Sequence, residues 1–130
     1  KGKPELLYIG DASDRDLRQK NERMEELGIK VMSQSGNMPD IIFYDQQEKR
    51  VIFIEIYHST DPFTLNRVNA LKSLCHCEAG TEAAFITAFD TPAKMLKHYK
   101  EVAWYTEIWS SDELTHLLHK NGDKFVGRPL

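Results

Sequence analysis

The sequence predicts an α/β fold with a mixed central β-sheet flanked by helices. Apolar, β-branched and aromatic runs alternate with segments of helical spacing in the order β, α, β, β, α, β, α, β. The run at residues 51–57 is apolar on both strand faces, which indicates a strand covered on both sides. The segment that joins this run to the run at 83–89 has the length of a parallel βαβ crossover.

The N-terminal half is expected to supply strands around one helix. Three apolar runs predict strands: residues 6–9, 41–45 and 51–57. The last two flank a polar stretch, which is typical of an antiparallel hairpin. A charged segment, residues 14–27, has its apolar side chains on one stripe and predicts a helix that Gly28 ends.

The C-terminal half is expected to alternate helices and strands. Two apolar runs predict strands, at residues 83–89 and 104–109. Three segments predict helices: residues 64–75, 92–102 and 112–118. Thr91 followed by Pro92 is typical of a helix N-terminus. The apolar positions expected to face inward are Leu65, Val68, Leu71 and Cys75 in the first helix and Met95, Leu96, Tyr99 and Val102 in the second.

Composition indicates one domain over residues 1–130, because 41% of the chain is hydrophobic and can form a single core. No apolar stretch approaches the roughly 20 residues of a membrane span, so no membrane partner is expected. Cys75 and Cys77 fall on different faces of a predicted helix, which disfavours a mutual disulfide and fits a reducing, cytoplasmic compartment. Because the chain starts at Lys1 directly before strand-like sequence, we expect it to be part of a longer protein.

Two acids flank the predicted hairpin and suggest a metal site. Asp40 opens the first hairpin strand, and Glu55 lies near the end of the second. If Asp45 faces Val51, counting outward places Asp40 opposite Ile56, one residue from Glu55. Neighbouring residues across an antiparallel pair are within side-chain reach. Two carboxylates placed in this way suit a hard cation such as Mg²⁺.

An ordered set of motifs extends the argument from these two acids to the whole chain. Asp40 and Glu55, on this order of elements, look like the first two acids of the PD-(D/E)xK nuclease motif. The sequence more closely resembles the catalytic, C-terminal part of the BsuBI/PstI-type restriction endonuclease family. The matching segments are residues 8–11, 38–45, 53–55, Ser59 with Pro62 and Arg67, 79–80, 87–89, 101–104, 106–109, 116–117 and 121–125.

This resemblance implies a restriction-endonuclease-like core and a type II enzyme that hydrolyses double-stranded DNA with Mg²⁺, or with Mn²⁺ as a substitute. It implies that Asp40, Glu55 and the carbonyl of Ile56 bind the metal. It further implies a restriction-modification system for phage defence in a bacterial or archaeal cytoplasm. Duplex cleavage needs one active site per strand, so a homodimer is expected, with the 104–109 strand as a candidate contact.

The general motif places a lysine two residues after the second acid, where this chain has Tyr57. A phenol is neutral at pH 7 and cannot supply a cation. Four nearby residues could stand in: His58, Asn66, Arg67 and Lys72. Arg67 is the first choice, because it lies early in the predicted helix and keeps its charge. The family often has a Lys-Arg pair on this helix, where this chain reads Asn66-Arg67.

Other interpretations stay open at this point. The missing lysine favours, as an alternative, a catalytically weakened relative that binds DNA or a protein through the same surface. A two-carboxylate metal enzyme with another substrate is a third interpretation. Glu55 could also be a structural acid paired with Arg67. A formal net charge of −3 counts against a non-specific nucleic-acid coating protein. Asp11 is a further candidate acid at the site, and Lys94, Lys97 and Lys100 are candidate phosphate contacts or a solvated helix face. The Cys75-His76-Cys77 segment suggests zinc by residue type, but its spacing is not that of a zinc finger or ribbon.

Overall fold

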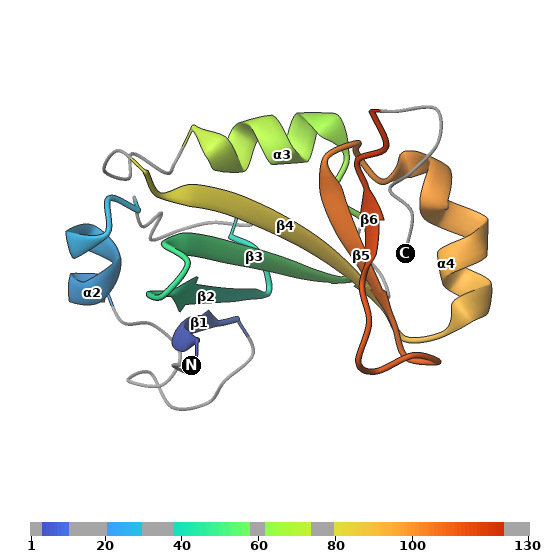
Figure 1. Cartoon of the computed structure of the whole chain (residues 1–130), viewed down its shortest axis with the longest axis horizontal. Coiled ribbons are helices and arrows are strands. Elements are labelled where there is room, and N and C mark those ends of the chain that lie inside the picture. The colour runs from blue at the N-terminus through green and yellow to red at the C-terminus, as the bar shows by residue number, and fades with distance from the viewer. Residues whose placement is uncertain (1–3, 11–20, 30–37, 58–61, 74–79, 124–130) are drawn as a thin grey trace.

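The computed structural model describes residues 4–10, 21–29, 38–57, 62–73 and 80–123. Figure 1 shows the elements, which are β1 (Glu5–Ile9), α2 (Asn21–Glu26), β2 (Ile41–Asp45), β3 (Arg50–Tyr57), α3 (Leu65–Lys72), β4 (Glu82–Phe89), α4 (Pro92–His98), the 3₁₀ turn η1 (Tyr99–Glu101), β5 (Thr106–Ser110) and β6 (Leu118–Lys120).

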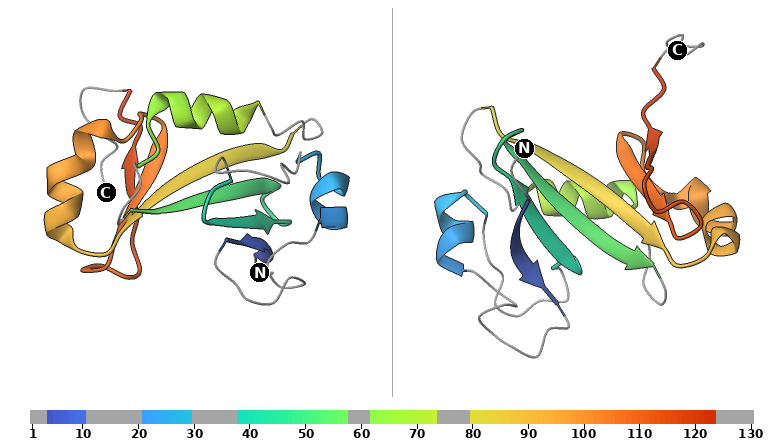
Figure 2. Two further views of the ribbon diagram at one scale, coloured as in Figure 1. Left: turned by 180° about the vertical axis from the view of Figure 1, so that it is seen from behind. Right: turned by 60° about the horizontal axis from the view of Figure 1, so that its bottom comes forward.

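The strands form one mixed sheet in the order β1-β2-β3-β4-β5-β6. The pairs β1–β2, β2–β3 and β5–β6 are antiparallel, and β3–β4 and β4–β5 are parallel. The predicted mixed sheet, the hairpin and the βαβ crossover through α3 are all confirmed. The two longest strands, β3 and β4, lie side by side at the centre of the sheet, as both views of Figure 2 show.

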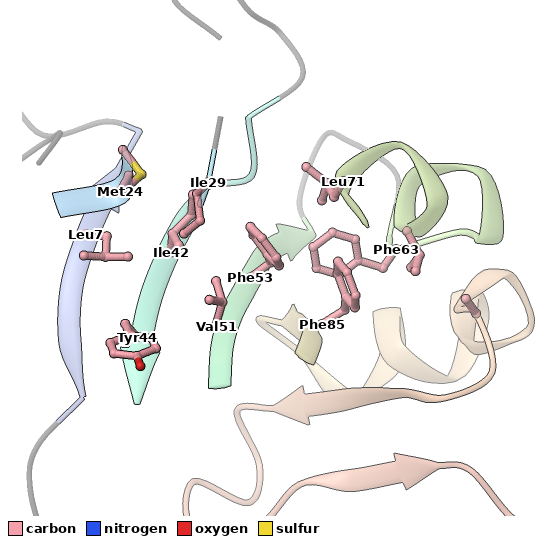
Figure 3. Close-up of a cluster of buried hydrophobic side chains, with 12 residues drawn as sticks. Leu7, Met24, Ile29, Ile42, Tyr44, Val51, Phe53, Phe63, Leu71 and Phe85 are labelled. Carbon is pink, nitrogen blue, oxygen red and sulfur yellow. The ribbon is translucent and has the colours of Figure 1, made fainter. Parts of the chain in front are cut away.

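The main core lies on one face of this sheet (Figure 3). Its buried members are Leu7, Met24, Ile29, Ile42, Tyr44, Val51, Phe53, Phe63, Val68, Leu71, Phe85 and Ala103. They come from β1–β4, from α2 and α3, and from the segments beside them. Phe53 and Phe85 stack across the central strand pair with ring centroids 5.2 Å apart. Such apolar burial supplies the main driving force for folding.

Strand β3 is covered more fully on one side than on the other. Its alternate residues Val51, Phe53 and Glu55 are buried, whereas Ile52, Ile54 and Ile56 are only half-buried. The physical reason is that α3 packs its buried residues, Val68 and Leu71, into the core on the first face. Glu55 therefore projects into the better-covered side of the sheet.

A second, smaller core lies towards the carboxyl end of the parallel strands. Phe89, Val102 and Ile108 are buried there, and Tyr57 and Met95 pack against them. The helix expected over residues 92–102 is shorter, because α4 changes into η1 after His98. This change alters the angular spacing of the side chains. Tyr99, the first residue of this turn, is exposed and not inward as expected, and so is Leu96 within α4.

The remaining differences from the sequence-based expectations are at the ends of elements. The structure has α3 at Leu65–Lys72 with Leu65 exposed, and β5 starts two residues later than expected. Tyr105 has a positive φ of 68°, which an extended strand does not accommodate. The helix expected over residues 112–118 is absent: residues 112–117 are turns and irregular backbone, and Leu118 begins β6. The predicted helix 14–27 is described only from Asn21, and no described helix is long and apolar enough to cross a membrane.

Candidate active site

The β2–β3 hairpin brings Asp40 and Glu55 together. The observed register pairs Ile41 with Ile54 and Asp45 with Arg50, one residue away from the register expected. The reason lies in the loop, where Asp45 Oδ1 accepts hydrogen bonds from two backbone N–H groups and Lys49 has a positive φ of 52°. Asp40 lies just outside the last ladder pair, Ile41 with Ile54, and its hydrogen bonds to Ile54 and Ile56 place it beside Glu55.

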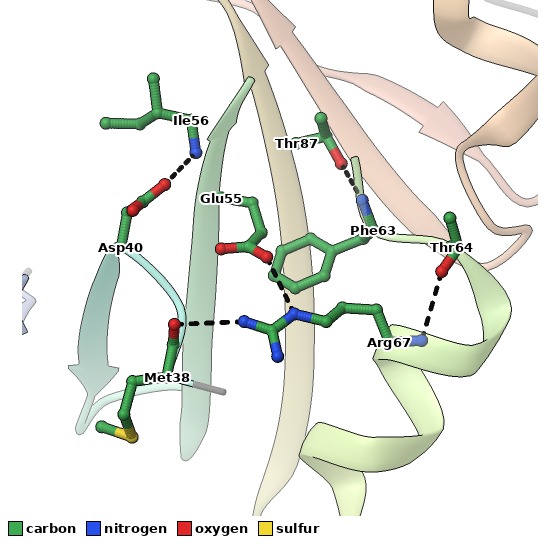
Figure 4. A network of polar contacts seen from close by, with 8 residues as sticks. All are labelled: Met38, Asp40, Glu55, Ile56, Phe63, Thr64, Arg67 and Thr87. Atoms are coloured by element: carbon green, nitrogen blue, oxygen red, sulfur yellow. Dashed lines mark hydrogen bonds and ion pairs between the residues drawn. The ribbon is translucent and has the colours of Figure 1, made fainter. Parts of the chain in front are cut away.

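Hydrogen bonds with the backbone of neighbouring segments hold Asp40 in position. Its N–H donates to the Ile54 carbonyl at 3.1 Å, and its carbonyl accepts from Gly10 N–H at 2.8 Å. Its carboxylate Oδ2 accepts from the N–H of Ile56 at 2.7 Å (Figure 4). Because the N–H and C=O of one strand residue point to the same neighbouring strand, the Ile56 carbonyl faces the Asp40 side. The Asp40 carboxylate and this carbonyl thus lie at the same end of β3.

Glu55 is a buried acid, 6% exposed. Burial raises the pKa of its carboxyl group; the hydrogen bond and charge of Arg67 oppose this rise, and the charge of Asp40 adds to it. In Figure 4 the Glu55 carboxylate is drawn between Asp40 and the Arg67 guanidinium.

Arg67 reaches this carboxylate from α3. Its Nε donates to Glu55 Oε2 at 2.9 Å, and an Nη donates to the Met38 carbonyl at 3.1 Å. Thr64 caps the helix, because its hydroxyl accepts from Arg67 N–H at 3.3 Å. Both the charge and the orientation of Glu55 therefore depend on the first turn of α3.

Sequence reasoning missed two contributors to this site. The Met38 carbonyl binds Arg67, and buried Thr87 accepts a hydrogen bond from Phe63 N–H at 3.1 Å. A backbone carbonyl leaves no trace in residue types. Thr87 carries a weak signal, because it is a polar residue within the otherwise apolar run of β4.

The structure also places the other candidates. Asn66 and Lys72 are exposed on α3, and Lys94 pairs with Asp90 at 3.1 Å on the surface. Lys97 and Lys100 are exposed on α4 and η1. Three candidates lie outside the described residues: Asp11, His58 and the Cys75-His76-Cys77 cluster.

Comparison with known proteins agrees with this geometry. The model of the BsuBI/PstI restriction endonuclease domain matches residues 1–123. The chain belongs to the BsuBI/PstI restriction endonuclease domain family. The type II restriction enzyme BsuBI of Bacillus subtilis is 32% identical over 124 residues, which are 94% of this chain and 38% of that enzyme. The type II restriction enzyme AplI of Arthrospira platensis is 28% identical over 102 residues, 77% of this chain and 31% of that enzyme.

A solved structure shows the same fold. The SdaI restriction endonuclease superposes with a TM-score of 0.83 at 31% identity, over 96% of this chain and 39% of that one. The mixed sheet with its helices is thus a restriction-endonuclease-like α/β core. This BsuBI/PstI-family chain spans less than two fifths of the length of these relatives.

The chain departs from the general nuclease motif at Tyr57, and the structure shows where that side chain lies. Its ring packs against Phe89 and His98, with centroids 5.3 and 4.5 Å away. Its hydroxyl hydrogen-bonds His98 Nε2 at 3.0 Å, and His98 Nδ1 lies 3.3 Å from Glu101. The phenol is therefore engaged with α4 and η1, in the second core.

The donors at the hairpin end fit a magnesium ion. One oxygen of Asp40 accepts from Ile56 and one of Glu55 accepts from Arg67, so each carboxylate keeps a second oxygen. The Ile56 carbonyl adds a neutral oxygen on the Asp40 side. No group of three or more His, Cys, Asp or Glu side chains suitable for a metal occurs within the described ranges. Mg²⁺ suits such a set, because it uses one or two carboxylates and keeps several water ligands.

Proposed function

We propose that this chain is the nuclease domain of a type II restriction enzyme and hydrolyses phosphodiester bonds in double-stranded DNA with Mg²⁺, or with Mn²⁺ in its place. The observation that carries the proposal is that Asp40, bound to Ile54 and Ile56 on either side of Glu55, lies beside that acid at the open end of the hairpin. Family membership and the restriction-endonuclease-like fold support it.

Each residue has a role in this proposal. Asp40, Glu55 and the Ile56 carbonyl hold the metal, which when bound polarises a phosphoryl oxygen and activates a water molecule. Arg67 opposes the rise that burial causes in the pKa of Glu55, and it orients the carboxylate. Its guanidinium retains further N–H donors beyond the two in use, and these offset charge on the phosphate. Tyr57 has a supporting role, because its hydroxyl is bound to His98.

One observation favours a second candidate, a weakened nuclease that binds DNA or a protein. Tyr57 stands where the motif has its lysine, and its hydroxyl contacts α4. Arg67, the proposed replacement, is bound to Glu55 in the described structure. A substrate panel of duplex DNA, single-stranded DNA and RNA also tests the third candidate, a two-carboxylate enzyme with a different substrate.

Plasmid cleavage tests the proposed activity directly. We expect nicking and linearisation with Mg²⁺ or Mn²⁺, and none with a chelator. Asp40→Ala should abolish cleavage, because it removes a metal ligand. It should lower the free energy of unfolding by only about 1–2 kcal/mol, the cost of losing the hydrogen bond from Ile56. DNA binding by the parent chain without cleavage under any metal would favour the weakened relative.

The wider setting is proposed by analogy with the relatives. We infer that the chain forms one domain, the C-terminal part of a longer bacterial or archaeal protein that acts in the cytoplasm. A homodimer also stays a prediction. The structure changes its expected contact, because β5 is paired on both sides by β4 and β6. A contact there would therefore use side chains, such as the exposed Trp104 and Tyr105.

A further inference from the structure

Thr87 is a buried polar residue in the middle of the sheet, beside the proposed site. It is 0% exposed, and the parallel register pairs it with Glu55 on the neighbouring strand. We propose that Thr87 is a positioning residue, which acts through Phe63 and the start of α3 to hold Arg67 against Glu55. The inference rests on the proposed function for its catalytic consequence, but not for its structural one.

The first step runs from Thr87 to Phe63. The Thr87 hydroxyl accepts the N–H of Phe63 at 3.1 Å, within a buried environment. A buried N–H without a partner is costly, so this acceptor fixes the backbone of Phe63. Two further contacts hold the same residue: its carbonyl accepts from Ala103 N–H at 2.7 Å, and its ring meets Phe85 edge-on at 5.4 Å.

The second step runs from Phe63 to Arg67. Phe63 directly precedes Thr64, the N-cap of α3, so fixing its backbone fixes where the helix begins. The Thr64 hydroxyl accepts from the N–H of Arg67, in the first turn. Arg67 lies three positions after the cap, and the residues between them are held in helical geometry. The guanidinium is thereby directed to Glu55 and to the Met38 carbonyl (Figure 4).

The consequence is a carboxylate oriented before any metal binds. Groups that orient metal ligands typically change metal affinity or activity by about 10–100-fold when removed. Thr87 touches neither of the acids through a hydrogen bond in the described structure, so its effect passes through Arg67. The hydroxyl is the feature that matters, because it supplies the acceptor for Phe63.

The test compares Thr87→Val with Thr87→Ser. Valine keeps the volume and removes the acceptor, whereas serine keeps the acceptor. We expect Thr87→Val to lower kcat about 10–100-fold with KM for DNA within about twofold, and Thr87→Ser to restore most of kcat. The matched control is Ser110→Ala on β5, which removes a buried hydroxyl that bonds Asp112 and lies outside this chain of contacts. It should leave kcat at the parent value.

A second readout does not depend on activity. The Arg67 Nε–H is hydrogen-bonded to Glu55 and should give a resolved, slowly exchanging NMR signal. Thr87→Val should lose that signal, and Thr87→Ser and Ser110→Ala should keep it. If Thr87→Val does not fold, Thr87→Ala makes the same comparison, because it also removes the hydroxyl.

The outcomes separate the two proposals. A parent chain that cleaves nothing overturns the proposed function, while the NMR comparison still decides the role of Thr87. A Thr87→Val variant that keeps both the Arg67 signal and the parent kcat overturns this inference. In an Arg67→Ala background, Thr87→Val should lower kcat by less than about twofold, because residues that act through one another are not additive. Full additivity would also overturn the inference.

Discussion

Arg67 and Glu55 form the ion pair on which the site depends. Glu55 is the more buried partner, with 8% of its side chain exposed against 20% for Arg67. Removing one member of a buried pair leaves an uncompensated charge, which costs more than the pair itself contributes. This ion pair was one of the alternatives left open by the sequence, as a structural explanation of Glu55. Under the proposed function the same contact also orients a metal ligand, and kinetics tests that role.

The kinetic test at this scale compares Arg67→Ala with Tyr57→Phe. We expect Arg67→Ala to lower turnover on the order of a hundredfold or more, because it removes an electrostatic donor and releases Glu55. Tyr57→Phe should cost much less, because it loses only the hydrogen bond to His98. Arg50→Ala, from a surface pair with Glu82, controls for general loss of a cation. This assignment would be contradicted if Arg67→Ala cleaved DNA at the parent rate while Tyr57→Phe was inactive.

The raised pKa of Glu55 predicts how stability changes with pH. Its principal cause is burial, so the folded protein binds this proton more tightly than the unfolded chain does. The free energy of unfolding should therefore fall as pH rises from the ordinary pKa of the carboxyl group through its raised folded pKa, and should then level off. Melting curves between about pH 4 and pH 8 without divalent metal measure this slope.

Glu55→Gln provides the comparison for that slope. The amide does not titrate, so the variant should lack the share of the pH dependence that Glu55 contributes. If the parent and Glu55→Gln lose stability in parallel over the window, the carboxyl group is not the source of the effect.

At the scale of elements, α3 positions its side chains through its cap. Thr64→Ala should lower the free energy of unfolding by about 1 kcal/mol, the usual cost of an N-cap, and should also reduce cleavage because Arg67 lies in the first turn. Thr91→Ala is a matched control, because Thr91 caps α4 in the same way, accepting from Lys94 N–H at 3.2 Å. Equal losses of cleavage in the two variants would refute a specific role for the start of α3.

The sequence also predicts some elements of the architecture better than others. The central strands are predicted well, because their apolar runs are long and bounded by polar turns. The segment 112–118 is wrongly predicted as helical, because local side-chain hydrogen bonds, such as Ser110 to Asp112, stabilise turns there instead. The prediction of a helix over residues 92–102 is also wrong at its end, because a 3₁₀ turn follows α4 there and changes which side chains face inward.

The candidate site, too, is predicted only in part from the sequence. The pair Asp40 and Glu55 can be predicted, because acids within apolar runs stand out. The hairpin register cannot be predicted to one residue, because it depends on the backbone angles of the loop at Lys49. The contacts of Arg67 with the Met38 carbonyl and of Thr87 with Phe63 N–H depend on tertiary packing, which single residue types do not encode.

At the scale of the whole molecule, charge and length bear on DNA recognition. The chain has a formal net charge of −3 and spans less than two fifths of its relatives. We expect it to bind duplex DNA weakly, without site preference, and more weakly as salt rises, because phosphate contacts release counterions. Anisotropy titrations with several duplexes at about 50 and 200 mM salt measure both properties. Tight, site-selective binding at physiological salt would contradict the prediction.

The hydrogen bond between Asp40 and Ile56 determines which inactive variant should be used to trap a substrate complex. The carboxylate of Asp40 accepts an N–H beyond the last ladder pair between β2 and β3, so it fastens the two strands together at their open end. Alanine at this position removes that hydrogen bond between the strands along with the charge. Asparagine retains an amide oxygen that can accept the same N–H, so Asp40→Asn is the better choice for crystallising uncleaved DNA on an undistorted hairpin.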